Sequence, residues 1–229
     1  MYCLDIPARL NELGGEPIKQ LRMARPVAAR AEIVTRLDDA RAKVLLPVAV
    51  DRDTRHERIA GQPVESYYAR WQGRDLNMLV YTSAALERTT EVTGHPLVTL
   101  NVESDSPDGA FFVYLEDVEP DGTVRYVTEG CLRAIHRATT PAPAEYQSIG
   151  PYRSYATGDM KPLVPGQAAE LAISLLPVSW LFRAHHRIRV AIACADSDHY
   201  ARIPWGRIPT IGVHRGGAKA SRIDLPVIP

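Results

Sequence analysis

Three consecutive strand-like runs, each closed by a turn signal, constrain the fold of this chain more than any other feature. Residues 98–102 (VTLNV) alternate side chains across a pleat and stop at the SDSPDG loop of residues 104–109. Residues 111–118 (FFVYLEDV) are rich in aromatic and β-branched side chains and end at the Pro-Asp-Gly turn of residues 120–122. Residues 123–130 (TVRYVTEG) then return. The pattern predicts an antiparallel meander in one sheet of an all-β domain.

The rest of the chain supplies more strands of the same short kind. The strand signal recurs at residues 76–83, 168–176, 186–193 and 221–228, although alanine and leucine leave a helix open for the second of these. Residues 177–182 (PVSWLF) are expected to form a single helical turn or a crossover. Many short strands, plentiful turns and no long 3.6-residue periodicity favour a β-sandwich or a jelly roll.

The remaining segments are expected to be connections or an N-terminal extension. Five prolines within residues 138–165 predict a long surface connection rather than a helix. Asp5 can cap a short helix near the N-terminus, residues 31–36 and 43–50 resemble two strands, and the charged residues 51–58 predict a solvated loop.

The charge balance and the cysteine pattern argue against several classes of partner and site. Lysine plus arginine equals aspartate plus glutamate at 27 each, so no net field attracts nucleic acid or an anionic membrane. No apolar run approaches the ~20 residues that span a bilayer, and the N-terminus lacks a signal-peptide pattern. Three widely spaced cysteines, Cys3, Cys131 and Cys194, favour neither a disulfide framework nor a zinc site. We therefore expect a cytoplasmic protein that binds neither nucleic acid nor membrane.

The sequence carries no recognisable catalytic, cofactor-binding or metal-binding motif. There is no Gly-x-Ser-x-Gly nucleophile elbow, and no glycine-rich phosphate loop follows a strand and opens a helix. His185 and His186 are adjacent, so in a strand they point to opposite faces and cannot ligate one metal ion. The cluster at residues 196–199 (DSDH) offers too few oxygens for calcium, which leaves a polar loop as the favoured interpretation and a structural cation as the alternative.

Two further groups of residues have both a structural and a functional interpretation. Four aspartates at the ends of the strand-like runs are expected to serve in turns: Asp105, Asp108, Asp117 and Asp121. Three aromatic residues before the first clear strand could stack on sugars, but core or inter-domain packing is the favoured use: Tyr67, Tyr68 and Trp71. Composition alone does not decide whether a serine and a histidine meet in space. The residues themselves therefore predict an all-β domain without an identifiable active site.

Several blocks of the sequence, in order, resemble one known family. They are EVTG (91–94), SDSPDG, FFVYLEDVEPDG, VTEGCLRAIHR (127–137), GPYRSY (150–155), KPLVPGQAAEL (161–171), LLPVSWLFRAHHRIRVAIACAD (175–196), ARIP (201–204) and SRIDLPV (221–227). These blocks are similar to the C-terminal domain of the cocaine-esterase and X-Pro dipeptidyl-peptidase family of serine hydrolases. The resemblance implies a jelly roll of the galactose-binding-like type that follows an α/β-hydrolase domain and a helical cap. In that family the catalytic triad lies upstream of the jelly roll, so the resemblance assigns no catalytic residue here.

The chain departs from the family pattern at three places. His185 stands where the family usually has glycine, so a left-handed backbone there would strain the histidine. Cys194 stands where a smaller residue is common, and the residues before about 70 do not match the hydrolase domain. We therefore expect one β-sandwich domain over residues 1–229, with a family-like core from about 71 to 229 and an N-terminal arm with extra strands in residues 1–70.

Two functions of different classes compete. In the first, the chain is an accessory domain that is inactive alone and packs on an α/β-hydrolase partner, or on itself as a dimer. In the second, it is a free-standing carbohydrate- or ligand-binding module, which many folds of this type are. An exposed apolar patch would favour the accessory domain, whereas a loop cluster with exposed aromatic rings and calcium would favour the module. An independent enzyme with an unrecognised site is a third, less favoured option.

Overall fold

The computed structural model describes residues 78–146, 149–195, 200–206, 208–215 and 220–228, together with the backbone of residues 19–22. The predictions for the N-terminal helix, for the strands at 31–36 and 43–50 and for the charged loop at 51–58 lie outside the described residues. So do those for the aromatic residues at 67–71 and for the polar cluster at 196–199.

The described part of the chain is built from short β-strands and two single 3₁₀ turns. In chain order the elements are β1 (Lys19–Arg22), β2 (Leu79–Thr82), β3 (Thr90–Gly94), β4 (Leu97–Ser104), β5 (Ala110–Val118), β6 (Val124–Arg133), η2 (Ala134–His136), η3 (Thr157–Asp159), β7 (Ala169–Ser174), β8 (Val178–Phe182), β9 (Arg187–Ala193), β10 (Ile211–Val213), β11 (Arg222–Leu225) and β12 (Val227–Ile228). No helix among the described residues is long and apolar enough to cross a membrane. The expected all-β class is confirmed.

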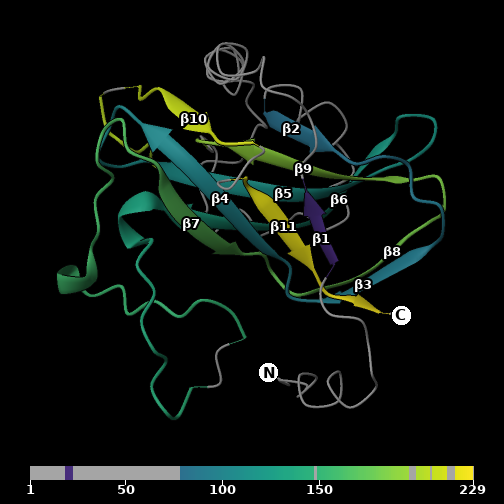
Figure 1. Cartoon of the computed structure of the whole chain (residues 1–229), viewed down its shortest axis with the longest axis horizontal. Helices are drawn as coiled ribbons and strands as arrows, with labels where there is room; N and C mark the ends of the chain where they lie inside the picture. The colour runs from purple at the N-terminus through teal and green to yellow at the C-terminus, as the bar shows by residue number, and fades with distance from the viewer. Residues whose placement is uncertain are drawn as a thin grey trace, which may run out of the picture.

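The strands form three antiparallel sheets (Figure 1). A five-stranded sheet has the order β1-β11-β4-β10, with β7 on the opposite edge of β4. A four-stranded sheet has the order β2-β9-β5-β6, and a small sheet has the order β12-β3-β8. The small sheet continues the large one, because β3 runs into β4 and β11 runs into β12. This arrangement is a β-sandwich.

The predicted three-stranded meander is wrong in one respect. Only β5 and β6 form a hairpin, whereas β4 belongs to the five-stranded sheet and β5 to the four-stranded sheet. The SDSPDG loop therefore carries the chain from one sheet to the other. The alternating pattern of β4 correctly indicated a buried face. The pattern does not show whether the next strand pairs with β4 in the same sheet or lies in the opposite sheet across the core.

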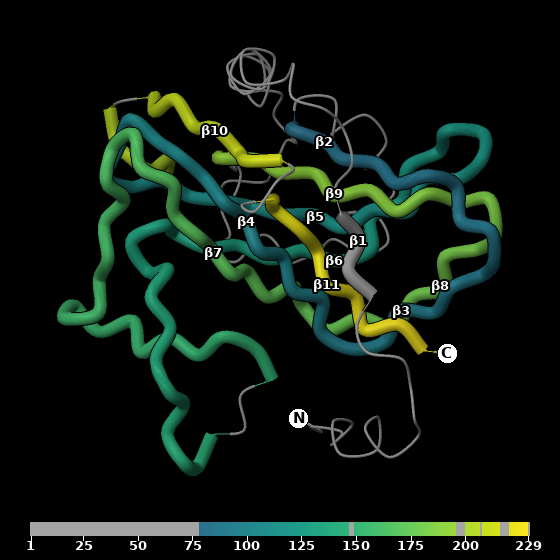
Figure 2. Tube along the Cα trace, viewed as in Figure 1, coloured from purple at the N-terminus to yellow at the C-terminus, as the bar shows by residue number. Residues whose placement is uncertain are grey.

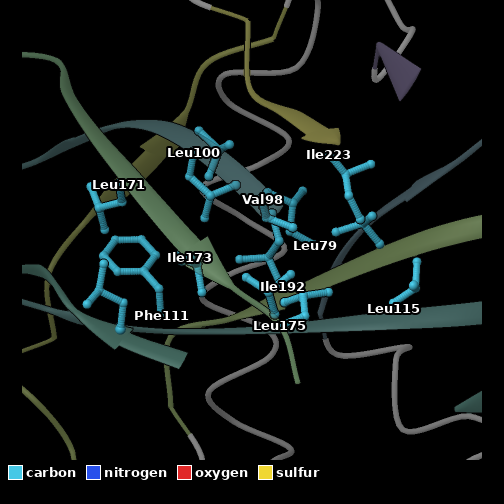
Figure 3. Packing of buried hydrophobic residues seen from close by; sticks show 14 of the residues in the cluster. Leu79, Val98, Leu100, Phe111, Leu115, Leu171, Ile173, Leu175, Ile192 and Ile223 are labelled. Atoms are coloured by element: carbon cyan, nitrogen blue, oxygen red, sulfur yellow. The ribbon is translucent and has the colours of Figure 1, made fainter. Parts of the chain in front are cut away.

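The core lies between the two larger sheets (Figure 3). Side chains from β4, β7 and β11 meet side chains from β2, β5 and β9, and the labelled members of this cluster include Leu100, Leu171 and Ile223 from one side and Phe111 and Ile192 from the other. Within the strand signal at residues 186–193, the alternation of apolar residues predicts that Ile188, Val190 and Ile192 share one face, and all three are buried in β9. That prediction is confirmed.

The segment from 169 to 182 shows one confirmed and one wrong expectation. Residues 169–174 form strand β7, not a helix, and pair with β4 along their whole length. Residues 178–182 form strand β8, which pairs with all five residues of β3, so the predicted helical turn is wrong. Alternation in β8 was hard to recognise because Ser179 and Leu181 are both exposed, which removes the usual contrast between polar and apolar positions.

Candidate functional site

A groove of about 520 Å³ opens at one end of the sandwich, where the end of β5 meets strand β8. Its lining comes from the β5–β6 hairpin, from β8 and from the turn before β9. The lining residues are Asp117, Glu119, Arg125, Ser179, Trp180, Leu181, Arg183 and His186. The groove therefore brings carboxylates, guanidinium groups, an imidazole and an indole ring together from three separate segments.

Asp117 organises the groove, and its predicted role in a turn is wrong. Strand β5 continues to Val118, so Asp117 pairs with Arg125 on one side and with Ile188 on the other. Its side chain is buried and accepts hydrogen bonds from Trp180 Nε1 at 3.1 Å and from His186 Nδ1 at 2.9 Å. Two donors compensate the cost of removing this carboxylate from water.

The Asp117–His186 pair resembles part of a hydrolytic triad but lacks the nucleophile geometry. A carboxylate at Nδ1 orients an imidazole so that Nε2 can act on a hydroxyl group. Ser179 lines the same groove, but its hydroxyl lies 3.0 Å from Thr93 Oγ1, and no hydrogen bond joins it to His186 in the described part of the chain. The contacts thus stabilise the junction between β5, β8 and the turn before β9.

The two histidines diverge, although for a different reason than the one predicted. They lie in the turn that precedes β9 rather than within the strand. His186 faces Asp117, whereas His185 is exposed and has a φ of 69°. The left-handed backbone, under which the histidine was expected to be strained, is therefore present at this position.

Two of the four aspartates, Asp108 and Asp121, serve turns as expected, whereas Asp105 lies in a loop and binds a distant segment. Asp108 accepts a hydrogen bond from the Gly109 N–H at 2.8 Å and another from Arg133 Nε at 2.7 Å. Asp105 accepts from the Thr210 N–H at 2.9 Å. Asp121 accepts from the backbone N–H two residues on at 2.9 Å, and this hydrogen bond lowers the pKa of Asp121 below its ordinary value.

The second notable surface is the β6–β7 connection, residues 138–165, which projects beyond the sheets at the lower left of Figure 1. Its described residues include five large apolar or aromatic side chains in contact with solvent: Tyr146, Ile149, Tyr155, Met160 and Val164. Tyr146 is 62% exposed and Tyr155 is 63% exposed. Such a concentration in one connection differs from the single exposed apolar residues that most surfaces carry.

Hydrogen bonds attach the connection to the sandwich along its course, which can be followed in Figure 2. The Thr140 N–H donates to the Tyr152 carbonyl at 3.0 Å, which folds the segment back on itself. The Leu163 N–H donates to the Pro107 carbonyl at 2.7 Å, and the Leu163 side chain is buried. The guanidinium group of Arg153 donates to the Ala172 carbonyl of β7. The connection is therefore attached to the sandwich at its middle and at its C-terminal end.

The exposed rings of the connection are held in defined positions. The rings of Tyr146 and Tyr152 lie 6.0 Å apart, and those of His136 and Tyr155 lie 5.3 Å apart in an edge-to-face arrangement. Tyr155 also has a φ of 54°, a conformation that costs energy for a residue with a side chain. Strained backbone of this kind concentrates at functional positions of proteins.

Sequence analysis missed these aromatic residues and also the exposed Trp205, at 86% exposure, in the loop before β10. The aromatic residues expected to pack in the core or between domains were Tyr67, Tyr68 and Trp71, which lie outside the described residues. The available signal was the tyrosines within a proline-rich stretch: without strand or helix periodicity, such rings have no regular way to reach the core.

Comparison with known proteins identifies close relatives. A putative serine esterase of Mycobacterium bovis is 55% identical over 161 residues, which cover 70% of this chain and 26% of that esterase. The cocaine esterase of a Rhodococcus species is 28% identical over 164 residues, which cover 66% of this chain and 26% of that enzyme. The matched part thus spans about a quarter of the length of these relatives.

Solved structures share the fold. An aminopeptidase from a marine sediment archaeon, Thaumarchaeota archaeon, superposes with a TM-score of 0.59 at 21% identity, over 76% of this chain and 30% of that one. An alpha-amino acid ester hydrolase superposes with a TM-score of 0.56 at 20% identity, over 70% of this chain and 27% of that one. In sequence, residues 40–224 match the family described as the X-Pro dipeptidyl-peptidase C-terminal non-catalytic domain. The sandwich and this match agree, and the chain belongs to that family of non-catalytic domains.

Proposed function

We propose that this chain is the accessory domain of a serine hydrolase and that it packs against the catalytic α/β-hydrolase domain through the β6–β7 connection. One observation carries the proposal: the exposed apolar and aromatic side chains of the connection are held in place by hydrogen bonds to the sandwich. At about 25 cal/mol per Å², covering several hundred Å² of such surface is worth on the order of 10 kcal/mol before the costs of association.

The proportions of the relatives support the same proposal. The matched segment is 26% of the mycobacterial esterase, so in that protein the remaining three quarters of the chain is covalently attached to this domain. A domain adjacent to a larger one presents apolar groups to it, and those groups are exposed when the neighbour is absent. When the neighbour is missing, we expect two copies of this chain to cover the connection in a symmetric dimer.

A chimera tests the packing directly. In the complete Mycobacterium bovis esterase, the 161-residue segment is replaced by the matching part of this chain, and thermal unfolding and ester hydrolysis are measured. We expect one cooperative transition at a higher temperature than that of the isolated chain. The double substitution Tyr146→Ser and Tyr155→Ser should lower this temperature in the chimera. It should leave that of the isolated chain unchanged at a dilution at which the chain is monomeric, because both rings are exposed in the single chain.

Leu181→Ser is the matched control, because Leu181 is also exposed but lies on β8, away from the connection. Equal effects of the control and the tyrosine substitutions would contradict the proposed surface. Two independent transitions, with this domain unfolding as it does alone, would contradict packing altogether. If light scattering at micromolar concentration then found only monomer, the free-standing binding module would become the better explanation.

A further inference from the structure

A second pocket, of about 490 Å³, lies where the β6–β7 connection leaves the sandwich and where it returns. Its lining residues are Arg137, Ala138, Thr139, Lys161, Ala168, Ala169 and Glu170. The two ends of the connection are joined here, because the Lys161 N–H donates to the Ile135 carbonyl of η2 at 2.8 Å. The pocket is therefore a fixed feature at the base of the proposed contact surface.

Arg137 brings into this pocket a positive charge that no described residue neutralises. Its Nη1 atom is buried and has no hydrogen-bond partner among the described residues. Burial also lowers the pKa of Arg137, as expected for a cation that loses water without gaining an anion. A buried donor without a partner costs free energy, and a charged one costs more than a neutral one.

The other charged groups of the pocket do not neutralise Arg137. Lys161 adds a second cation, and Glu170 is the one carboxylate of the lining. Both side chains are exposed, and no ion pair joins Glu170 to Arg137 or to Lys161 within the described residues. The lining therefore has an excess of positive charge at a site that a docked domain would remove further from water.

We propose that the hydrolase domain inserts an aspartate or glutamate side chain into this pocket, where its carboxylate pairs with Arg137 and is attracted by Lys161. The inference rests on the proposed packing and adds its polar anchor. A planar guanidinium group can hold a carboxylate through two parallel hydrogen bonds, which a lysine cannot do. The pair fixes the orientation of the two domains, while the aromatic surface of the connection supplies most of the buried area.

The test measures affinity in trans. The probe is the remaining part of the mycobacterial esterase, expressed without its 161-residue matching segment, and it is titrated with this chain by calorimetry. Arg137→Gln should weaken binding on the order of thirtyfold, because the substitution leaves the partner's carboxylate buried and unpaired. The affinity of Arg137→Lys should lie between those of the unsubstituted chain and Arg137→Gln, because lysine keeps the positive charge but cannot form two parallel hydrogen bonds. Lys161→Gln should weaken binding less, because Lys161 is an exposed charge.

Two controls separate this role from a structural one. Arg88→Gln removes an exposed arginine in the turn before β3 and should leave the affinity unchanged. Denaturant unfolding of the isolated Arg137→Gln chain should show no loss of stability, because Nη1 has no partner to lose. If the truncated esterase does not fold, the same variants in the complete chimera give the answer through the difference between chimera and isolated-chain unfolding temperatures.

The possible failures are distinguishable. Binding of the unsubstituted chain that Arg137→Gln does not weaken would overturn the carboxylate anchor and leave the packing proposal intact. Weaker binding together with a less stable isolated chain would make Arg137 a structural residue and overturn the anchor as well. No binding in trans, together with independent unfolding in the chimera, would overturn both.

Discussion

At the scale of single residues, His185 shows how a turn can demand a backbone that its side chain disfavours. The His186 N–H donates to the Arg183 carbonyl at 3.1 Å, which closes a four-residue turn with His185 at its third position. The positive φ of 69° at that position is the mark of a type II turn, which favours glycine or asparagine. The turn is nevertheless fixed, because the His185 N–H donates to the Leu86 carbonyl at 2.8 Å.

His185→Gly is expected to stabilise the protein by roughly 1 kcal/mol, through relief of left-handed strain that outweighs the greater entropy of glycine in the unfolded chain. For a domain of this size the gain corresponds to an increase of about 2–4 °C in melting temperature. Calorimetry of the two proteins measures it. A lower melting temperature for the glycine variant would mean that the histidine side chain makes compensating contacts.

Tyr81→Phe is a second prediction at this scale. The Tyr81 hydroxyl is buried without a hydrogen-bond partner among the described residues, while the ring packs on the core and lies 5.7 Å from the Arg215 guanidinium carbon. Phenylalanine keeps both ring contacts and removes the unsatisfied hydroxyl. We expect a gain of about 1 kcal/mol at neutral pH, measured by urea unfolding.

The pH dependence of the same variant gives an independent check. Burial raises the pKa of Tyr81 to about 12, although Arg215 opposes the shift. Between pH 10 and 12 the unfolded chain releases this proton while the folded chain keeps it, so stability falls by about 1.4 kcal/mol per pH unit. The advantage of Tyr81→Phe should therefore widen above pH 10. If the difference in free energy of unfolding between the two proteins stayed constant above pH 10, the Tyr81 hydroxyl would be in contact with water.

At the scale of elements, the packing of β6 against the end of β7 depends on one glycine. A Cβ atom on Gly130 would lie 2.4 Å from the Ser174 carbonyl oxygen and 2.9 Å from a Leu175 methyl carbon. Beside Gly130, Thr128 Oγ1 donates to the carbonyl of Leu176, which follows β7, at 2.9 Å, and the Leu176 N–H donates to the Glu129 carbonyl at 2.8 Å. The chain after β7 thus approaches β6 more closely than any side chain at Gly130 allows.

Gly130→Ala is expected to destabilise the protein by about 1–3 kcal/mol, because the obstructing atom belongs to the backbone and cannot rotate away. Gly212→Ala is the matched control: this glycine also lies in a strand, but nothing stands within 4 Å of its would-be Cβ atom. Urea midpoints of the two variants should therefore differ clearly. Similar midpoints would show that the end of β7 can move.

At the scale of the whole molecule, the chain belongs to a family of non-catalytic domains, and the packing of this domain on a catalytic neighbour is our proposal. The chain lacks the Gly-x-Ser-x-Gly elbow, and the Asp117–His186 pair is directed at Trp180 and the strand junction instead of at a hydroxyl nucleophile. The exposed Tyr146 and Tyr155 lie on the β6–β7 connection, and Arg137, whose Nη1 has no partner among the described residues, lies beside it. The assignment of the sandwich to the galactose-binding-like type and the cytoplasmic location stay predictions.

The purified chain alone is expected to hydrolyse neither p-nitrophenyl esters nor X-Pro amides, because no serine is activated by the Asp117–His186 pair in the described structure. Initial rates should equal those of a buffer blank, and a fluorophosphonate probe should not label the chain. The chimeric esterase serves as the positive control. Turnover that such a probe abolishes, with labelling of a serine in this chain, would refute the prediction.

The sequence by itself determined the features that depend on local spacing. Alternating side chains and proline-glycine turns predicted the all-β class, the β5–β6 hairpin and the buried face of β9, because each reflects conformations of neighbouring residues. The left-handed backbone at His185 was instead implied by the glycine that the family has at this position. Ordered blocks of residues likewise indicated the family, which the match over residues 40–224 confirms.

Only the tertiary structure decided which segments meet. Strand β4 crosses to the opposite sheet, β8 pairs with β3 across more than 80 residues of chain, and Asp117 becomes buried between Trp180 and His186. The same holds for the pocket at Arg137, whose walls come from both ends of a long connection. Side-chain periodicity predicts that one face of a strand is buried, but it does not predict which segment covers that face. The free energy of burial is nearly the same for any apolar neighbour, so the packing of the complete chain decides which segments meet.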